Sequence, residues 1–233
     1  MTSDKKEGFG LLITRHSSLV TSSSPSRLFQ EDESLFAESN FNPAHIFPRR
    51  RPLEIEIGSG KARFLVAAAR ANPDHDFLGL ERALAYYRVC RDRLARAGLS
   101  NARILRADGR LFVEALSPES VRAFHIYFPD PWPKKRQKKR RLLDGVMLET
   151  LASRLEAGGL LRIATDHADY GSALAPLAAT VPLLEPLEWE TAPAPPPTNY
   201  EIKYREEGRT IWRFLFRKRA TAELTGSLRS SSD

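Results

Sequence analysis

The segment that decides the fold is residues 53–71, which read LEIEIGSGKARFLVAAARA. Residues 53–57 have the length and apolar character of a short buried strand, and GSG ends that strand. Residues 62–71 are rich in alanine and other good helix formers, so they are predicted to form a helix. A strand that passes through a glycine turn into a helix is the opening unit of a sheet with helical crossovers.

The same alternation continues along the chain. Further strands are predicted at residues 76–80, 102–107, 123–128 and 159–165, helices at 83–98, 142–159 and 168–178, and two last strands at 187–190 and 210–216. We therefore predict an α/β fold with a mostly parallel seven-stranded sheet, helices on both faces and an antiparallel edge strand. Ligands of such sheets bind at the carboxyl ends of the strands.

Residues 46–220 are expected to form this domain. The first 45 residues are polar, rich in serine (SSLVTSSSPS) and poorly periodic, so we expect a flexible N-terminal extension. Residues 221–233 are expected to form a flexible C-terminal tail.

The net charge of +7 is concentrated in one place. The chain has 36 Lys and Arg residues against 29 Asp and Glu, and seven of the basic residues lie in residues 134–141. Without these seven, basic and acidic residues would be equal in number. A local concentration of this kind favours a docking site for phosphates, and the alternatives are a solvated helix face or a localisation signal.

The remaining composition excludes several classes of protein. The single cysteine, Cys90, rules out an intramolecular disulfide and fits a reducing cytosol. No apolar run approaches the roughly 20 residues of a membrane span, and the N-terminus lacks the apolar stretch of a signal peptide. We therefore expect a soluble, cytoplasmic protein. Five scattered histidines without ligand spacing predict no metal site.

The glycine turn EIGSG, residues 56–60, does not match the common nucleotide fingerprints. A dinucleotide fingerprint requires a third glycine at position 63, where this chain has Arg63. The phosphate-loop pattern fails as well, because no GK[ST] follows. The turn therefore argues against NAD and against a nucleoside triphosphate.

Carboxylates stand beside three strand ends. Glu56 precedes the glycines, Glu81 follows the second strand and Asp108 follows the third. Three carboxylates would repel a pyrophosphate, but they suit S-adenosylmethionine, whose sulfonium and amino groups are positive. Glu81 is placed to accept from ribose hydroxyls and Glu56 to meet a cationic group. The alternative is a tight turn with acids that only cap helices.

Residues 128–141, FPDPWPKKRQKKRR, set one carboxylate against the basic run. Asp130 lies between Pro129 and Pro131, each of which fixes its own φ and restricts the residue before it. The segment is therefore predicted to hold Asp130 in a stiff frame. The alternative is a rigid turn whose Trp132 packs in a core, and Trp132 is also a candidate to flank an inserted base.

The motifs EIGSG, GLER, RAD, FPDPWPKKRQKKRR, ATD and TNYEIKYREEG resemble, in this order, those of the bacterial tRNA (guanine-N7-)-methyltransferase family. They extend from residue 56 to residue 208, and PDPW followed by the basic run is the most specific. The resemblance implies a Rossmann-like methyltransferase fold and S-adenosylmethionine as methyl donor. It also implies methylation of a guanine in the variable loop of tRNA, guanosine 46, to 7-methylguanosine.

The resemblance also implies roles for individual residues. The cofactor-binding residues would be Glu56, Gly58, Gly60, Glu81, Asp108 and Asp130, of which Asp130 would also be catalytic. The substrate-binding residues would be Lys134, Asp166, Thr198, Asn199, Tyr200 and Glu201. The tRNA-binding residues would be Arg136, Lys138, Lys139, Arg140 and Arg141. Ala62 and Gln137 depart from the family pattern, in which many members have glycine and histidine, and neither departure affects a carboxylate.

The chemistry of guanine fits these residues. N7 carries a lone pair and no proton, so its attack on a methyl group needs no general base. Positive charge develops on the ring as the methyl group leaves sulfur, and a fixed carboxylate near the ring stabilises that charge. Lysine and arginine side chains along a polyanion give binding that weakens steeply with salt.

Two further segments keep two interpretations each. Asp166 follows the fifth predicted strand and either caps the next helix or contacts the guanine edge, whose N1 and N2 are donors. Residues 192–208 begin as a proline-rich connector and form either a polar loop between edge strands or a loop that closes over the site.

Two other functions remain open at the level of sequence. One is a methyltransferase for another base or amine, because the bracketed PDPW resembles motifs that serve exocyclic amines. The other is a non-catalytic RNA-binding protein on the same scaffold. The sequence leaves the oligomeric state, monomer or homodimer, undecided.

Overall fold

The computed structural model describes residues 29–30, 46–47 and 51–220. The predicted C-terminal tail and, apart from residues 29–30, the predicted N-terminal extension lie outside this described part. The chain forms one sheet with strand order β1-β4-β3-β2-β5-β6-β8-β7. Neighbouring strands from β1 to β6 pair in parallel, whereas β8 pairs antiparallel with both β6 and β7. The predicted α/β architecture with seven main strands and an antiparallel edge is confirmed.

The strands have the following bounds: β1 Phe29–Gln30, β2 Leu53–Ile57, β3 Asp76–Leu80, β4 Ala102–Leu105, β5 Val121–Tyr127, β6 Leu155–Thr165, β7 Leu184–Leu187 and β8 Trp212–Lys218. The α-helices are α1 Arg63–Ala71, α2 Leu84–Ala97, α3 Gly109–Ala115, α4 Gly145–Arg154, α5 Ala168–Ala178 and α6 Asn199–Glu206. Two 3₁₀ helices, η4 Lys135–Arg140 and η5 Trp189–Thr191, complete the described part.

Helices cover both faces of the sheet, as predicted. One apolar core joins α1 and α2 to β3 and β4 through residues such as Phe64, Phe77 and Leu94. The other joins α3, α4 and α5 to the opposite face through residues such as Phe124 and Leu148. Successive strand residues point to opposite faces, so each central strand supplies both cores. None of the helices in the described part is long and apolar enough to cross a membrane.

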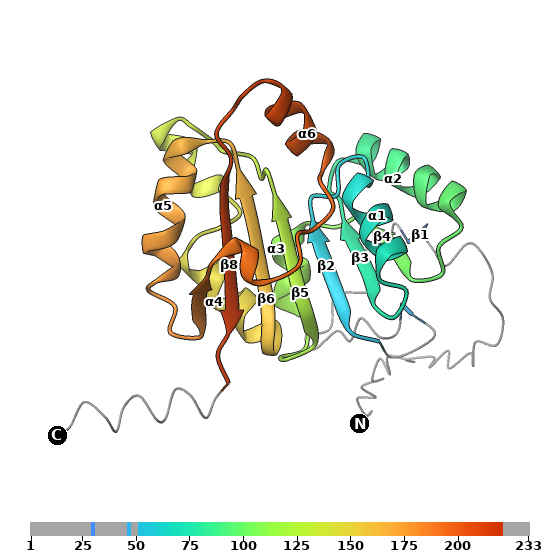
Figure 1. The fold of residues 1–233 in the computed structure, drawn as a ribbon, viewed down its shortest axis with the longest axis horizontal. Coiled ribbons are helices and arrows are strands. Elements are labelled where there is room, and N and C mark those ends of the chain that lie inside the picture. The colour runs from blue at the N-terminus through green and yellow to red at the C-terminus, as the bar shows by residue number, and fades with distance from the viewer. Residues whose placement is uncertain (1–28, 31–45, 48–50, 221–233) are drawn as a thin grey trace, which may run out of the picture.

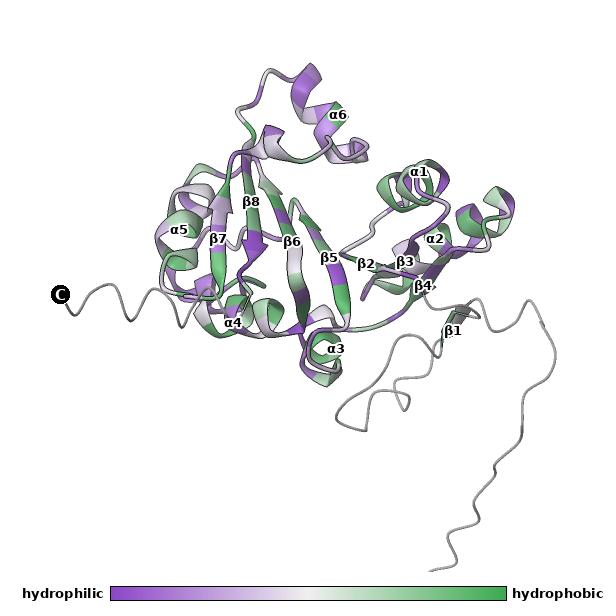
Figure 2. Ribbon diagram, turned by 60° about the horizontal axis from the view of Figure 1, so that its bottom comes forward, coloured by the Kyte–Doolittle hydropathy of each residue, from purple (hydrophilic) through white to green (hydrophobic). Residues whose placement is uncertain are grey.

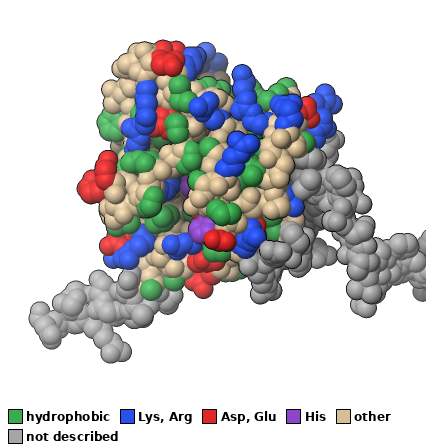
Figure 3. Space-filling model, turned by 45° about the vertical axis from the view of Figure 1, so that its right-hand side comes forward, with side chains coloured by type: hydrophobic (Ala, Val, Ile, Leu, Met, Phe, Trp, Pro, Cys, Tyr) green, Lys and Arg blue, Asp and Glu red, His purple; other side chains and the backbone are tan. Residues whose placement is uncertain are grey.

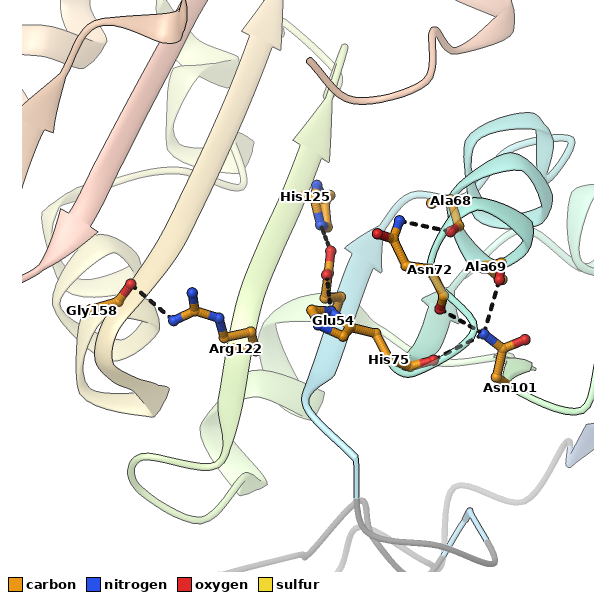
Figure 4. A network of polar contacts seen from close by, with 9 residues as sticks. All are labelled: Glu54, Ala68, Ala69, Asn72, His75, Asn101, Arg122, His125 and Gly158. Carbon is orange, nitrogen blue, oxygen red and sulfur yellow. Dashed lines mark hydrogen bonds and ion pairs between the residues drawn. The ribbon is translucent and has the colours of Figure 1, made fainter. Parts of the chain in front are cut away.

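Glu54 in β2 ties the sheet together through two histidines (Figure 4). Its Oε1 lies 2.6 Å from Nδ1 of His75, and its Oε2 lies 2.7 Å from Nε2 of His125 in β5. Burial raises the pKa of Glu54, but hydrogen bonds and charge from the two histidines outweigh it and leave the pKa below its usual value. The carboxylate therefore stays charged between His75, which directly precedes β3, and His125 of β5.

Several elements differ from the sequence prediction. The strand predicted at residues 187–190 lies at β7, and Trp189 instead enters η5 with its ring 5.2 Å from the Arg162 guanidinium. The predicted helix 142–159 ends at Arg154, and β6 begins at once. An irregularity between Val121 and Ala123 of β5 absorbs the extra residues of β6.

The helix α3 was not predicted, and the sequence predicted a loop where α6 lies. This helix stands off the sheet near the carboxyl ends of the strands, and its surface is largely hydrophilic (Figure 2). Since those strand ends are where ligands of such sheets bind, α6 stands over the region that the sequence marked.

Candidate active site at the carboxyl edge of the sheet

The glycine turn after β2 rests directly on β3. Gly58 and Gly60 have φ values of 85° and 52°, which suit glycine. The backbone N–H groups of Gly58 and Ser59 both donate to the carbonyl of Leu80, at 2.8 and 3.1 Å. A Cβ on Gly79 would lie 2.5 Å from Oγ of Ser59, so the absence of a side chain there allows the close contact.

Glu81 fixes this turn from the end of β3. Its Oε2 accepts from the Gly60 N–H at 2.9 Å, and its Oε1 accepts from the Ala83 N–H, also at 2.9 Å. Each carboxylate oxygen keeps a second lone pair. The structure thus brings together Glu81 and Gly60, two of the candidate cofactor residues, with acceptor capacity left for a ligand.

Glu56, near the end of β2, carries a buried carboxyl group with little around it to stabilise its charged form. Its side chain is 4% exposed, and Oε2 has no hydrogen-bond partner among the described residues. The hydroxyl of Ser59 is likewise buried and unpartnered within the described part. Burial raises the pKa of Glu56 to about 8; the nearby Ser59 hydroxyl opposes this shift and the charge of Glu81 adds to it. Such a group fits a ligand that carries positive charge.

Asp108 follows β4 and caps α3. Its Oδ1 accepts from the Arg110 N–H at 2.9 Å and, at 3.5 Å, from the Leu111 N–H. Its Oδ2 lies 3.5 Å from Arg82 at the surface. The alternative interpretation of this acid as a helix cap is therefore realised, and one oxygen still faces outward.

Asp130 is exposed in a segment whose backbone is held in unusual conformations. Phe128 and Trp132, which flank the Pro129–Pro131 bracket, have φ values of 52° and 40°. Non-glycine residues rarely adopt such values, and when they do the strain often marks a functional site. Trp132 does not pack in a core: it is half-buried, with the Arg140 guanidinium 5.0 Å from its ring.

Aromatic side chains join α6 to this segment. The Phe128 ring lies 5.3 Å from the Tyr204 ring and 6.2 Å from the Tyr200 ring. Burial raises the pKa of Tyr200, and the neighbouring phenols of Tyr86 and Tyr204 and the charge of Asp130 raise it further. The helix therefore stands beside Asp130, and Tyr200 and Asp130 are brought together.

Two of the predicted substrate residues hold α6 in place. Thr198 is its N-cap and accepts from the Glu201 N–H at 3.0 Å. Glu201 is buried, and its Oε1 accepts from Arg205 at 2.6 Å and from Arg213 of β8 at 2.8 Å. Of the four predicted substrate residues in this segment, 198–201, Asn199 and Tyr200 are the more accessible to solvent.

Asp166 is not a helix cap. The N-cap of α5 is His167, and Oδ2 of Asp166 instead accepts from Arg209 at 2.8 Å. The same guanidinium lies 4.4 Å from the Tyr204 ring. Asp166 therefore reaches α6 through Arg209, whereas no hydrogen bond or ion pair joins the Lys134 side chain to any described residue.

The basic run contains both exposed and paired side chains. Residues 135–140 form η4, and the side chains of Lys134, Lys135, Arg136, Lys139 and Arg140 are exposed. Lys138 donates to Asp169 of α5 at 2.8 Å. Arg141 is 8% exposed and binds both Asp169 and the carbonyl of Pro131. Hydrogen bonds from Lys138 and Arg141 lower the pKa of Asp169 to about 2. The prediction that Arg141 binds RNA is at odds with its burial.

Sequence reasoning missed Tyr86, Tyr204 and Arg209 beside the site. The signal for α6 was present, because Thr198 and Glu201 are three residues apart, as in a capping box. Tyr200 and Tyr204 are four apart and so share one side of a helix.

Comparisons with known proteins identify the family of this chain. Residues 50–214 match the family described as "Putative methyltransferase". Among solved structures, the chain resembles a SAM-dependent O-methyltransferase from Thermotoga maritima and a precorrin-6y C5,15-methyltransferase from Geobacter metallireducens. Each is 15% identical with a TM-score of 0.51; the first match covers 74% of this chain and 61% of the other, the second 73% and 82%. These two show the fold alone.

Curated relatives are closer. A tRNA (guanine-N(7)-)-methyltransferase of Rhodococcus jostii (strain RHA1) is 38% identical over 74% of this chain and 68% of its own length. A tRNA (guanine-N(7)-)-methyltransferase of Bordetella pertussis (strain Tohama I) is 36% identical over 78% of this chain and 74% of its own length. At this identity and coverage, the chain belongs to the tRNA (guanine-N(7)-)-methyltransferase family.

Proposed function

We propose that this protein transfers a methyl group from S-adenosylmethionine to N7 of a guanine in the variable loop of tRNA, guanosine 46, and forms 7-methylguanosine. Family membership supports the reaction class. The observation that carries the proposal is Asp130, an exposed carboxylate between two prolines in a strained segment that leads directly into a run of exposed cations. We infer that the protein acts in the cytoplasm, where tRNA is found.

The residues at the strand ends suit the methyl donor. When bound, S-adenosylmethionine supplies an electrophilic methyl group on a sulfonium centre. Glu56 would compensate positive charge on the donor, because Oε2 of its buried carboxyl lacks a hydrogen-bond partner among the described residues. Glu81 and Asp108 would accept from ribose hydroxyls and from the base, and the turn at Gly58 and Gly60 gives the donor close access to backbone.

Asp130 is proposed as the catalytic residue. Guanine N7 needs no proton removed, so the carboxylate acts by its charge and position. It stabilises the positive charge that develops on the ring and orients the base toward the donor. Its two prolines and the strained neighbours Phe128 and Trp132 hold it in place before the substrate arrives.

The remaining predicted residues would bind tRNA. Lys134, Arg136, Lys139 and Arg140 are exposed and would neutralise phosphates, with Lys138 beside them on Asp169. Tyr200 and Asn199 on α6 would contact the base, and Asp166 would accept from the guanine edge. Thr198 and Glu201 would act by holding α6 beside Asp130.

The test is transfer of labelled methyl from S-adenosylmethionine to unmodified tRNA, followed by digestion and identification of the nucleoside. We expect 7-methylguanosine from the wild type and a rate at least 100-fold lower from Asp130→Asn, with the thermal stability unchanged because Asp130 is exposed. Label in another nucleoside would point to a methyltransferase for a different base. Absence of label in tRNA, despite donor binding, would favour a non-catalytic RNA-binding protein.

A further inference from the structure

A second basic surface lies between α1 and α2, apart from the basic run. It is a groove of about 530 Å³ whose apolar floor comes from small side chains of both helices. Its polar lining consists of four arginines: Arg63, Arg70, Arg93 and Arg96. Figure 3 shows many Lys and Arg side chains on this side of the molecule.

The four guanidinium groups are available to a ligand. Arg63, Arg70 and Arg96 are exposed and Arg93 is half-buried. No hydrogen bond or ion pair ties any of their side chains to another residue of the described part. Four positive charges that share one groove without an acid repel one another, and a bound anion would relieve this repulsion.

The spacing of the charges favours an extended polyanion. Arg63 and Arg70 are two turns apart on one side of α1, about 10 Å along its axis. Arg93 and Arg96 are about one turn apart on the facing side of α2. The charges therefore line both walls of an open channel, which suits successive phosphates better than a single small anion.

The groove begins close to the candidate active site along the chain. Arg63 opens α1 only three residues after Gly60, whose N–H binds Glu81. The basic run lies on the other side of the site, tied to α5 by Asp169. In Figure 1, α5 and the α1–α2 pair stand at opposite sides of the sheet, with α6 between them. Cationic surfaces thus flank the site on two sides.

We propose that the groove between α1 and α2 binds the sugar-phosphate backbone of the tRNA substrate, as a second contact besides the basic run. This inference rests on the proposed function for the identity of the RNA. The groove would hold a stretch of backbone away from the target base, so it contributes to tRNA affinity and not to the methyl-transfer step.

The test compares two double variants of α2 that remove the same charge. Arg93→Ala/Arg96→Ala changes the groove. Arg88→Ala/Arg91→Ala is the control, because both arginines belong to α2 and neither lines the groove. Alanine is the best helix former, so both variants should fold, and unchanged binding of S-adenosylmethionine verifies this.

The measurement is the Kd for unmodified tRNA across a salt series. We expect the groove variant to bind about tenfold more weakly near 0.1 M salt, with the slope of log K against log salt reduced by about 1.5. The control variant should change little, and kcat at saturating tRNA should stay the same. Equal losses in both variants, or none in the groove variant, would overturn the inference. If the wild type forms no 7-methylguanosine but the groove variant alone loses tRNA affinity, the groove stands and the proposed reaction falls.

Discussion

Arg141 donates a hydrogen bond of 2.5 Å to Asp169, and this contact turns the last residue of the basic run inward. Its guanidinium also donates to the Pro131 carbonyl at 2.8 Å and lies 4.5 Å from the Tyr170 ring. Arg141 thus links the Asp130 segment to α5, whereas the preceding Arg140 is exposed over Trp132. Two adjacent arginines therefore have different tasks.

The first prediction is that substitutions of Arg141 and Arg140 have different effects. Arg141→Ala should lower the free energy of unfolding by about 2 kcal/mol, because it removes a buried side chain and leaves the Pro131 carbonyl without its donor. Arg140→Ala should leave stability within about 0.5 kcal/mol and weaken tRNA binding. Thermal or urea unfolding and tRNA titration measure the two effects. Equal stability of the two variants would contradict the structural assignment of Arg141.

The second prediction concerns protons released on donor binding. Glu56 has a pKa of about 8, so at pH 7 its carboxyl is mostly protonated. A cationic donor favours the carboxylate and lowers this pKa, so binding should release a proton and tighten as pH rises from about 6 to 8. Calorimetry of S-adenosylmethionine binding in buffers of different ionisation enthalpy measures the release. Glu56→Gln should abolish it, and proton release that persists in this variant would exclude Glu56 as the source.

The third prediction is that the raised pKa of Glu56 makes the stability of the fold depend on pH. Its pKa is higher in the folded chain than the ordinary 4.5, so the unfolded chain loses the proton first as pH rises. The ligand-free fold should therefore lose stability between about pH 4.5 and 8, by at most about 1.4 kcal/mol per pH unit. Glu56→Gln removes this dependence. The unfolding midpoint of this variant should therefore rise relative to that of the wild type as pH approaches 8. A constant difference between the two proteins across this range would refute the burial effect.

The fourth prediction concerns the support of the glycine turn. Gly79→Ala would place Cβ 2.5 Å from Ser59 Oγ and 2.8 Å from Leu65 Cδ2, so the side chains that pack the turn against β3 must shift. We expect a loss of about 1–3 kcal/mol in stability and weaker binding of S-adenosylmethionine. Gly145→Ala is the matched control, since its Cβ would meet only Leu177 at 3.8 Å. Stability should there stay within about 1 kcal/mol of the wild type. Donor affinity that is unaffected by Gly79→Ala would separate this turn from the donor site.

Much of the fold could be predicted from the sequence, because buried strands and amphipathic helices alternate along the chain. The strands and helices around the two cores have the apolar periods that packing requires. Trp189 misled the prediction, because an aromatic residue favours strands while its actual contact is with Arg162, far away in sequence. The helix α6 was hidden by its polar composition, since its stability comes from the Thr198 cap and the pairing of Glu201.

The site was predictable in its residue types and less so in their roles. Motif positions identified the carboxylates, but the burial of Glu56 and Arg141 depends on tertiary packing that a pattern does not encode. The groove between α1 and α2 escaped detection because its arginines alternate with apolar helix positions. Acidic residues elsewhere cancel them in any count of net charge.

The central claim, attack by guanine N7, is tested most directly with tRNA transcribed with 7-deazaguanosine in place of guanosine. This transcript lacks the N7 lone pair but keeps the phosphates and the Watson–Crick edge of each base. We predict that the protein binds it with nearly the affinity of ordinary transcript and transfers no methyl group to it, while ordinary transcript gains 7-methylguanosine. Methyl transfer to the 7-deaza transcript would contradict attack by N7, because another atom would then be the acceptor.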